Sequence, residues 1–355
     1  MKNIRLFMLL AAASLLQGCS DDDNDILETA TTGQAVVTLL VTPNGMGDNG
    51  YDDDAATGVF SFMKEQGTPV QLLQPDDMTQ AETLYREWLA SNAEKDSVVL
   101  VVGGAEYEAL VQRIPPSLSG KGSRVLMYES DQTMAGVSTV MINRYGVSYL
   151  AGTMSASFDA LIFAAAPGFS TLEESIAGFS EGYRAAGDGE YTLSLQYLAD
   201  GEEGFALPDS ALHVLSDRSL AAGDSYREII FPLLGGSSMG VVKFLNDDAY
   251  QEAMMVGMDV DMAGWTYNIP FSMVVHIGDE IRNYLDAWKQ GEEWPDTQRL
   301  GMVDGAVEIV INSAFQLHLI TFDGFYGDEY DKVFVNQYQK YYDEAVRKEE
   351  EYENQ

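Results

Sequence analysis

The sequence predicts an α/β protein made of two Rossmann-like lobes, and three observations support this fold class. The chain has 355 residues, which is long enough for two domains that each have their own core. Short apolar segments alternate with amphipathic segments over residues 34–330, at the spacing of a doubly wound fold. An uncharged run at residues 36–42 leads into a glycine-rich loop and then an amphipathic segment, which is typical of the ligand-binding corner of open α/β folds.

Residues 1–18 have the composition of a secretory signal peptide. Two basic residues precede an apolar core at 6–16, which is too short to span a membrane. The segment Leu-Gln-Gly-Cys at 16–19 resembles a bacterial lipobox, so we expect Cys19 to be lipidated; the alternative is an ordinary cleaved signal with a chance cysteine. Cys19 is the only cysteine, which excludes a disulfide framework and a cysteine-based metal site.

Residues 19–33 are expected to form an acidic tether, which opens with the run SDDDND at 20–25. One interpretation is a solvated segment, because high charge and low hydrophobicity disfavour a packed core. The other is that the run resembles the acidic export signals of Bacteroidetes surface lipoproteins. We therefore expect a lipid anchor in the cell envelope at the outer membrane, with surface exposure favoured over a periplasmic position.

The net charge of the chain disfavours some classes of binding partner. Asp plus Glu total 56 against 20 Lys plus Arg, which gives a formal net charge of −36. Such a charge disfavours nucleic acid and anionic membrane surfaces as partners, and it keeps a protein soluble and monomeric.

Residues 36–58 form the predicted ligand-binding corner. Residues 36–42 are typical of a strand buried on both faces of a parallel sheet. The loop at 43–50 is rich in glycine and leaves room for a ligand near bare backbone. The three aspartates at 52–54 are suited to cap the helix that follows, and Tyr51 is suited to stack on a ring. So acidic a loop would repel phosphate and favours a hydroxylated or nitrogenous ligand.

The remaining elements are predicted from apolar runs and helical spacing. Helices are expected at 80–92 and 171–186, and a C-terminal helix at 334–350 is expected to pack an aromatic stripe on lobe two. The predicted strands are 70–73, 98–102, 125–128, 137–142, 161–165, 192–197, 228–234 and 253–257.

Six ordered motifs carry a family resemblance. The loop GMGDNGYDDDAATG and five later segments are similar to the basic membrane protein family of bacterial solute-binding lipoproteins, whose best-known members bind purine nucleosides. The matching segments span residues 45–58, 145–152, 178–182, 234–240, 257–261 and 300–306.

The resemblance implies the type I periplasmic-binding-protein fold, in which two lobes are joined by a hinge with several chain crossings. Lobe one would hold 34–143 plus 272–304, and lobe two 144–271 plus 305–355, with a return strand near 306–311. The lobes would close over a small ligand, which would then pass to an importer of the ABC-transporter type.

The resemblance and the carboxyl ends of the predicted strands together give the candidate ligand contacts. Tyr51 would stack on a base, and Asp259 would hold ribose hydroxyls. Simpler roles are a helix cap for Asp52, a plain turn for Gly103 and Gly104, and a core position for Phe231. The candidates are Asn44, Asp48, Tyr51, Asp52, Gly103, Gly104, Glu129, Phe231, Gly235, Ser237, Asp259 and His276.

The sequence departs from the family pattern at three candidate contacts. Asn44 or Pro43 stands where the family often has an Asp. Glu129 stands where the family has an Asp that hydrogen-bonds the purine, and it reaches one methylene further, which implies a shifted or different base; a solvent-facing Glu is the alternative. The family's lysine is missing, and His276 or Val275 takes its place, depending on the register.

Enzyme motifs are absent from the sequence. The three histidines lie far apart in no metal-ligand spacing, and there is no nucleophile elbow, phosphate loop or catalytic cysteine. We therefore expect a non-enzymatic solute-binding protein with no cofactor and no metal. The competing hypothesis is a surface lipoprotein of the same fold that binds a sugar, a glycan fragment or a protein partner. A hydrolase on this scaffold would need a nucleophile and a base that the sequence does not offer.

Overall fold

The computed structural model covers most of the chain beyond the predicted tether. The predicted signal peptide, Cys19 and the tether lie outside the described residues, as do Asn44 and Asp48. No helix within the described part of the chain is long and apolar enough to cross a membrane. The described residues are 36–43, 46–47, 50–223, 228–247, 253–312, 315 and 327–354.

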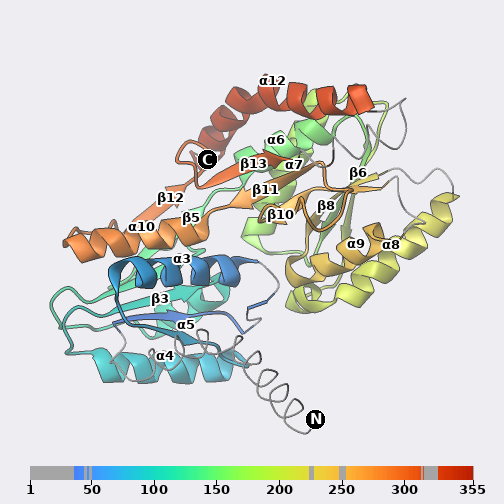
Figure 1. Cartoon of the computed structure of the whole chain (residues 1–355). Coiled ribbons are helices and arrows are strands. Elements are labelled where there is room, and N and C mark those ends of the chain that lie inside the picture. Colours follow the sequence, from blue (N-terminus) through green and yellow to red (C-terminus); the bar gives the residue numbers. More distant parts are fainter. Residues whose placement is uncertain are drawn as a thin grey trace, which may run out of the picture.

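Lobe one is built on a six-stranded sheet in the order β12-β5-β4-β3-β1-β2, in which every pair of neighbouring strands is parallel (Figure 1). The strands β1 and β3 are buried along their whole length because they carry almost only apolar residues. The strands are β1 (Val37–Leu40), β2 (Val70–Leu73), β3 (Val99–Gly103), β4 (Arg124–Tyr128), β5 (Ser138–Ile142) and β12 (Thr297–Leu300).

Helices cover both faces of this sheet (Figure 1). Leu39 and Leu40 of β1 point to opposite faces and join different core clusters. On one face α3 and α10 pack closely where they meet at Gly58 and Gly278. A Cβ added at Gly58 would lie only 2.0 Å from the carbonyl oxygen of Gly278, so a glycine is needed there. The helices are α3 (Tyr51–Gln66) and α10 (Ile277–Gln290) on that face, and α4 (Met78–Asn92) and α5 (Glu108–Arg113) on the other, with a short 3-10 turn η1 (Ala105–Tyr107).

Lobe two contains a four-stranded parallel sheet in the order β7-β6-β8-β9 and a three-stranded sheet in the order β10-β11-β13. In the second sheet β11 pairs parallel with β10 and antiparallel with β13. The strand predicted at 253–257 is in fact two short strands. The strands are β6 (Asp159–Ala164), β7 (Leu193–Tyr197), β8 (Glu228–Leu233), β9 (Met254–Met255), β10 (Gly257–Asp259), β11 (Phe271–Val275) and β13 (Val307–Ile311).

The helices of lobe two pack tightly where glycines allow close approach. A Cβ at Gly152 of α6 would lie 2.1 Å from the carbonyl oxygen of Phe179 in α7, so the two helices touch backbone to backbone. α12 lies across α6 on the outside (Figure 1). The helices are α6 (Tyr145–Ser155), α7 (Ser170–Ala186), α8 (Pro208–Ala222), α9 (Ser238–Leu245) and α12 (Gly327–Glu353), with 3-10 turns η2 (Glu202–Ala206) and η4 (Gly235–Ser237).

The described part of the chain passes between the lobes three times: after β5, after β11 and between β12 and β13. This arrangement confirms the predicted α/β fold of two lobes. The boundaries differ in detail from those predicted. Residues 272–275, which were expected in lobe one, belong to β11, whose partners β10 and β13 lie in lobe two. The return strand expected near 306–311 is β13, and the helix expected at 334–350 lies within α12.

The end of α12 packs on two of these crossings. Glu349 is 4% exposed, and its Oε1 accepts a hydrogen bond of 2.9 Å from the backbone N–H of Met302. Its Oε2 has no hydrogen-bond partner among the described residues and lies against Gly146. Burial raises the pKa of Glu349 from 4.5 to about 7.

This buried carboxyl should make stability depend on pH. The folded chain keeps the Glu349 proton up to about pH 7, whereas the unfolded chain releases it near pH 4.5. Stability is therefore lost as the pH rises through this window, by on the order of 3 kcal/mol. Glu349→Gln should remove this part of the pH dependence in urea unfolding between pH 4.5 and 8. The exposed neighbour Glu350, changed to Gln, is the control and should leave the profile as it is; equal profiles for all three chains would contradict the assignment.

Candidate functional site

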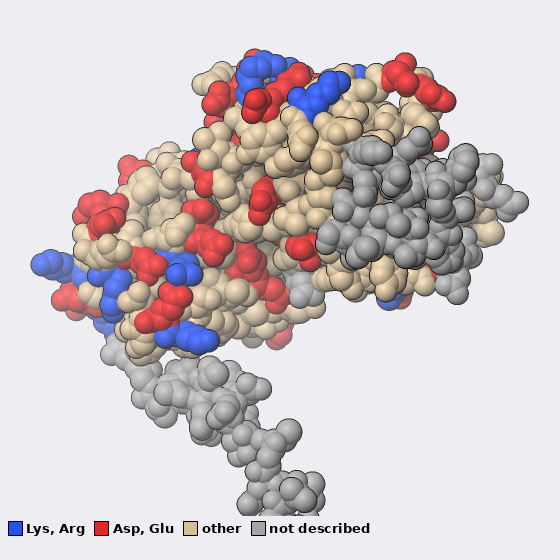
Figure 2. Space-filling model, turned by 45° about the horizontal axis from the view of Figure 1, so that its top comes forward, with Lys and Arg blue, Asp and Glu red and all other residues tan. Residues whose placement is uncertain are grey.

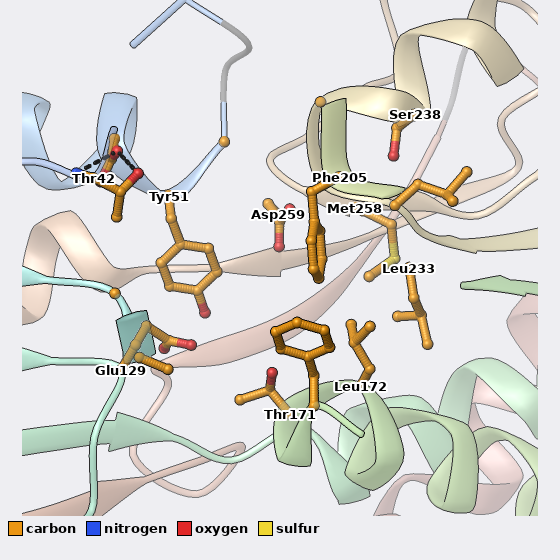
Figure 3. Close-up of a pocket in the computed structure, with 18 of the residues that line it drawn as sticks. Thr42, Tyr51, Glu129, Thr171, Leu172, Phe205, Leu233, Ser238, Met258 and Asp259 are labelled. Carbon is orange, nitrogen blue, oxygen red and sulfur yellow. Dashed lines mark hydrogen bonds between the residues drawn. The ribbon is translucent and has the colours of Figure 1, made fainter. Parts of the chain in front are cut away.

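A cavity of about 710 Å³ lies between the two lobes (Figure 3). It is lined by residues that follow the carboxyl ends of strands from both lobes, where ligands of open parallel sheets bind. From lobe one these residues follow β1, β3 and β4, and from lobe two they follow β8 and β10. They include Thr42, Gly104, Glu129, Leu234, Gly235 and Asp259.

The sequence suggests that the three aspartates at 52–54 cap α3, but in the structure they accept hydrogen bonds from segments outside the helix. No side chain caps the helix at Gly50. Instead Asp52 accepts hydrogen bonds from the backbone N–H and the hydroxyl of Thr42 at 3.0 and 2.7 Å, and from the Tyr128 hydroxyl at 2.9 Å. Asp53 accepts from the Gly47 N–H, and Asp54 from the Gly278 N–H. Asp52 thus ties β1, β4 and α3 together at the cavity wall.

The half-buried Tyr51 and the buried Glu129 and Arg144 form a cluster on the lobe one side. Arg144 donates to Glu129 Oε2 at 2.8 Å and to the Tyr51 hydroxyl, and its guanidinium carbon lies 5.0 Å from the centre of the Tyr51 ring. Glu129 Oε1 is buried and has no hydrogen-bond partner among the described residues. Burial raises the pKa of Glu129, while Arg144 acts to lower it. Burial also raises the pKa of Tyr51 well above its ordinary value.

The backbone is strained at two acidic positions in the cavity. Glu129 has a φ of 60° and Asp259 a φ of 65°, in the left-handed region that residues with a Cβ rarely adopt. Both residues come at the ends of strands, β4 in lobe one and β10 in lobe two. Such strain is found at ligand sites, where the surrounding fold holds a side chain in the position that binding needs.

The aromatic wall of lobe two is built from Phe169 and Phe205, which pack edge to face at a centroid distance of 5.1 Å. Figure 3 shows the rings of Tyr51 and Phe205 facing each other across the cavity, with Asp259 between them and the Glu129 carboxylate beside the Tyr51 hydroxyl. Phe231, the predicted aromatic contact, does not line the cavity: it is fully buried and stacks on Phe179 at 4.4 Å.

Three further candidates also lie outside the cavity lining, each for a structural reason. Gly103 makes room for Tyr128, since a Cβ there would lie 1.5 Å from that ring. The Ser237 hydroxyl bonds the backbone of Gly204 and Leu207. His276 begins α10, and its ring lies 3.2 Å from Glu308.

The predicted residues that line the cavity are Tyr51, Asp52, Gly104, Glu129, Gly235 and Asp259.

The described lining is strongly acidic. It contains five carboxylates against a single arginine, Arg144, which is already paired with Glu129. Figure 2 shows acidic side chains over the middle of the visible face as well, with basic side chains gathered toward two edges. The cavity therefore repels anions and favours neutral or cationic guests that bring hydrogen-bond donors. The described residues contain no group of three His, Cys, Asp or Glu side chains placed to hold a metal ion.

Sequence reasoning missed Arg144, Phe169 and Phe205. Phe169 follows the end of β6, so the rule that strand ends face the cleft would have found it. Arg144 lies directly before the motif at 145–152 and could have been found from its place at the predicted lobe boundary. Phe205 belongs to the short turn η2, whose sequence carries no periodic signal.

No protein-family model and no curated protein matches the chain. Solved structures do match. One is a solute-binding protein of an ABC transporter system from Aeropyrum pernix, with 14% identity, a TM-score of 0.66 and 90% of each chain covered. A second is described as a transcriptional activator of the comK gene from Bacillus halodurans, with 17% identity, a TM-score of 0.62, and 87% of this chain and 98% of that one covered.

A third is a periplasmic solute-binding protein of an ABC transporter from Actinobacillus succinogenes with bound D-allose. It has 13% identity and a TM-score of 0.59, over 80% of this chain and 99% of that one. At these identities the matches show the fold, which is that of periplasmic solute-binding proteins. The narrower resemblance to the basic membrane protein family stays a prediction.

The role of Asp52 as a link between elements can be tested by truncation. Asp52→Ala would leave the buried Thr42 N–H and the Tyr128 hydroxyl without an acceptor, which should cost about 2–4 kcal/mol in urea unfolding. Asp77 is the control, since it only caps α4 through the Gln80 N–H at 2.8 Å. Asp77→Ala should cost about 1 kcal/mol. Equal losses for the two variants would mean that Asp52 is no more than a cap.

Proposed function

We propose that the protein is a lipid-anchored solute-binding protein that captures a small, neutral, ring-bearing and hydroxylated ligand between its lobes for uptake. The observation that carries this proposal is the pairing of Tyr51 and Phe205 across a cavity whose lining holds two acidic residues with strained backbone, Glu129 and Asp259. Aromatic faces on both sides suit a ring, and carboxylates suit its N–H and O–H donors.

A purine nucleoside is the ligand we propose first. Its base would lie between the aromatic side chains, with an N–H donor on the free oxygen of Glu129. Its ribose diol would donate to Asp259, because a carboxylate can accept from two adjacent hydroxyls at once. The acidic lining supports a nucleoside over a nucleotide, since a phosphate would face five carboxylates and no unpaired cation among the described lining residues.

A sugar is the second candidate ligand. The fold neighbour from Actinobacillus succinogenes was solved with D-allose. Carboxylates and an aromatic plate also suit the hydroxyls and the apolar face of a sugar ring. In this version the protein is a surface-exposed lipoprotein that takes up a sugar or glycan fragment, or binds a protein partner.

The proposal is for binding without catalysis. The described lining holds no histidine and no cysteine. Closure of the lobes would exclude water and strengthen the hydrogen bonds to the carboxylates. We place the protein in the cell envelope as a monomer, anchored through Cys19 at the outer membrane, with an ABC importer as its partner in transport.

The ligand class can be tested by a thermal-shift screen of the chain from residue 20 onward. Adenosine, guanosine and inosine should raise the melting temperature if the first candidate is right, and D-allose and D-arabinose if the second is. Nucleoside monophosphates should have no effect, because the acidic lining repels them. Stabilisation by the monophosphates alone, or turnover of any compound, would contradict the proposal.

The role of Asp259 as the acceptor of ligand hydroxyls can be tested by substitution. Asp259→Ala should abolish the shift given by the ligand that the screen identifies, because the hydroxyl acceptor is lost. Asp261→Ala is the control: Asp261 is exposed, lies outside the cavity lining and accepts only from the nearby Ala263 N–H. The control should keep the full shift. An unchanged shift for Asp259→Ala would end the role proposed for that residue.

A further inference from the structure

Arg144 lies where the chain first passes from lobe one to lobe two, between β5 and α6. Its side chain is only 8% exposed and is held on lobe one by three neighbours. It donates to the carbonyl of Ile142 at 2.9 Å, to Glu129 Oε2 at 2.8 Å and to the Tyr51 hydroxyl. Its guanidinium also lies over the Tyr51 ring, in the geometry of a cation–π contact.

The main chain of the same residue is held by lobe two. The backbone N–H groups of Arg144 and Tyr145 donate to Glu174 Oε1 at 2.7 and 2.9 Å. Glu174 belongs to α7 and is buried, and its other oxygen lies 3.8 Å from Arg299, which is on β12 beside another crossing. One residue therefore joins the ligand-facing wall of lobe one to a helix of lobe two.

The charges around Arg144 explain why it can be buried here. Burial opposes the charge on its guanidinium, but three carboxylates from different elements raise its pKa above the ordinary value: Glu129, Asp259 and Glu174. In return, the guanidinium is the cation that offsets the buried Glu129 carboxylate. It binds one oxygen of that carboxylate and leaves Oε1 without a hydrogen-bond partner among the described residues, in a side chain that belongs to the cavity lining. A buried carboxylate without such a partner would take up a proton.

We propose that Arg144 is a positioning residue of the cleft. It fixes the Tyr51 ring and the Glu129 carboxylate for a neutral ligand that supplies a hydrogen-bond donor, and it links their position to lobe two through Glu174. This inference rests on the proposed function. In this role Arg144 acts through its two neighbours, and a ligand needs no anionic group to pair with it.

Three variants of the full chain separate positioning from simple stability. Arg144→Met removes the cation. The double variant Arg144→Met with Glu129→Gln removes both charges, so that no lone buried charge remains to unfold the chain. Arg218→Met is the matched control, because Arg218 pairs with the buried Glu228 at 2.6 Å in lobe two but does not line the cavity.

Calorimetric titration with adenosine and with D-allose measures the effect on binding. The single and double variants should each bind the probe about tenfold more weakly or worse, whereas Arg218→Met should bind as the unchanged chain does. In Arg144→Met the affinity should fall further as the pH drops, because Glu129 without its cation takes up a proton more readily and then accepts more weakly. In the double variant this dependence on pH should vanish.

Hydrogen exchange gives a readout that needs no ligand. Arg144→Met and the double variant should exchange faster at the backbone around residues 51–54 in α3 and around 170–176 in α7, and Arg218→Met should not. Wild-type exchange at both segments, with wild-type affinity, would overturn the inference. If the unchanged chain binds neither adenosine nor D-allose, the proposed function fails. The hydrogen-exchange rates at 51–54 and 170–176 then still decide whether Arg144 holds these two segments in place.

Discussion

The ion pair between Arg144 and Glu129 is the interaction on which the cleft depends. It joins a hinge residue to the end of β4, and it is almost fully withdrawn from water. A buried pair of this kind is costly to desolvate and contributes little stability on balance, so it is better understood as a device that fixes geometry. The same guanidinium donates to the Tyr51 hydroxyl, and one oxygen of the Glu129 carboxylate has no hydrogen-bond partner among the described residues.

The rest of the site follows from the topology. Parallel strands deliver their carboxyl ends to one edge, so each lobe presents its polar turns to the other. Asp52 of α3 accepts hydrogen bonds from Thr42, which follows β1, and from Tyr128 of β4. Gly103 leaves the space that the Tyr128 ring occupies. Lobe two contributes the aromatic pair Phe169 and Phe205 and the strained Asp259. The wall is acidic, which favours a neutral guest rich in hydrogen-bond donors.

The sequence was most informative where periodicity was strong. The uncharged run before Pro43, the β2 segment and the helices α4 and α7 were predicted with small errors, because burial on both faces or on one stripe leaves a regular pattern. The helices α8 and α10 were not predicted, and α12 begins before its predicted start. The site was harder, because a residue's partners come from distant segments. Phe231 was predicted to contact the ligand because it lies near a strand end, yet it packs in the core on Phe179. Arg144 could not be recognised from the sequence, because its contact with Tyr51 joins residues that are far apart in the chain.

The most direct test of this account is a crystal structure of the chain grown with adenosine and, separately, with D-allose. The account predicts one of these compounds between Tyr51 and Phe205, with hydroxyls on Asp259, a donor on the free oxygen of Glu129, and the Arg144 contacts intact. A compound bound on an outer face of either lobe, or bound in the cleft through a salt bridge to Arg144 with Glu129 displaced, would contradict it.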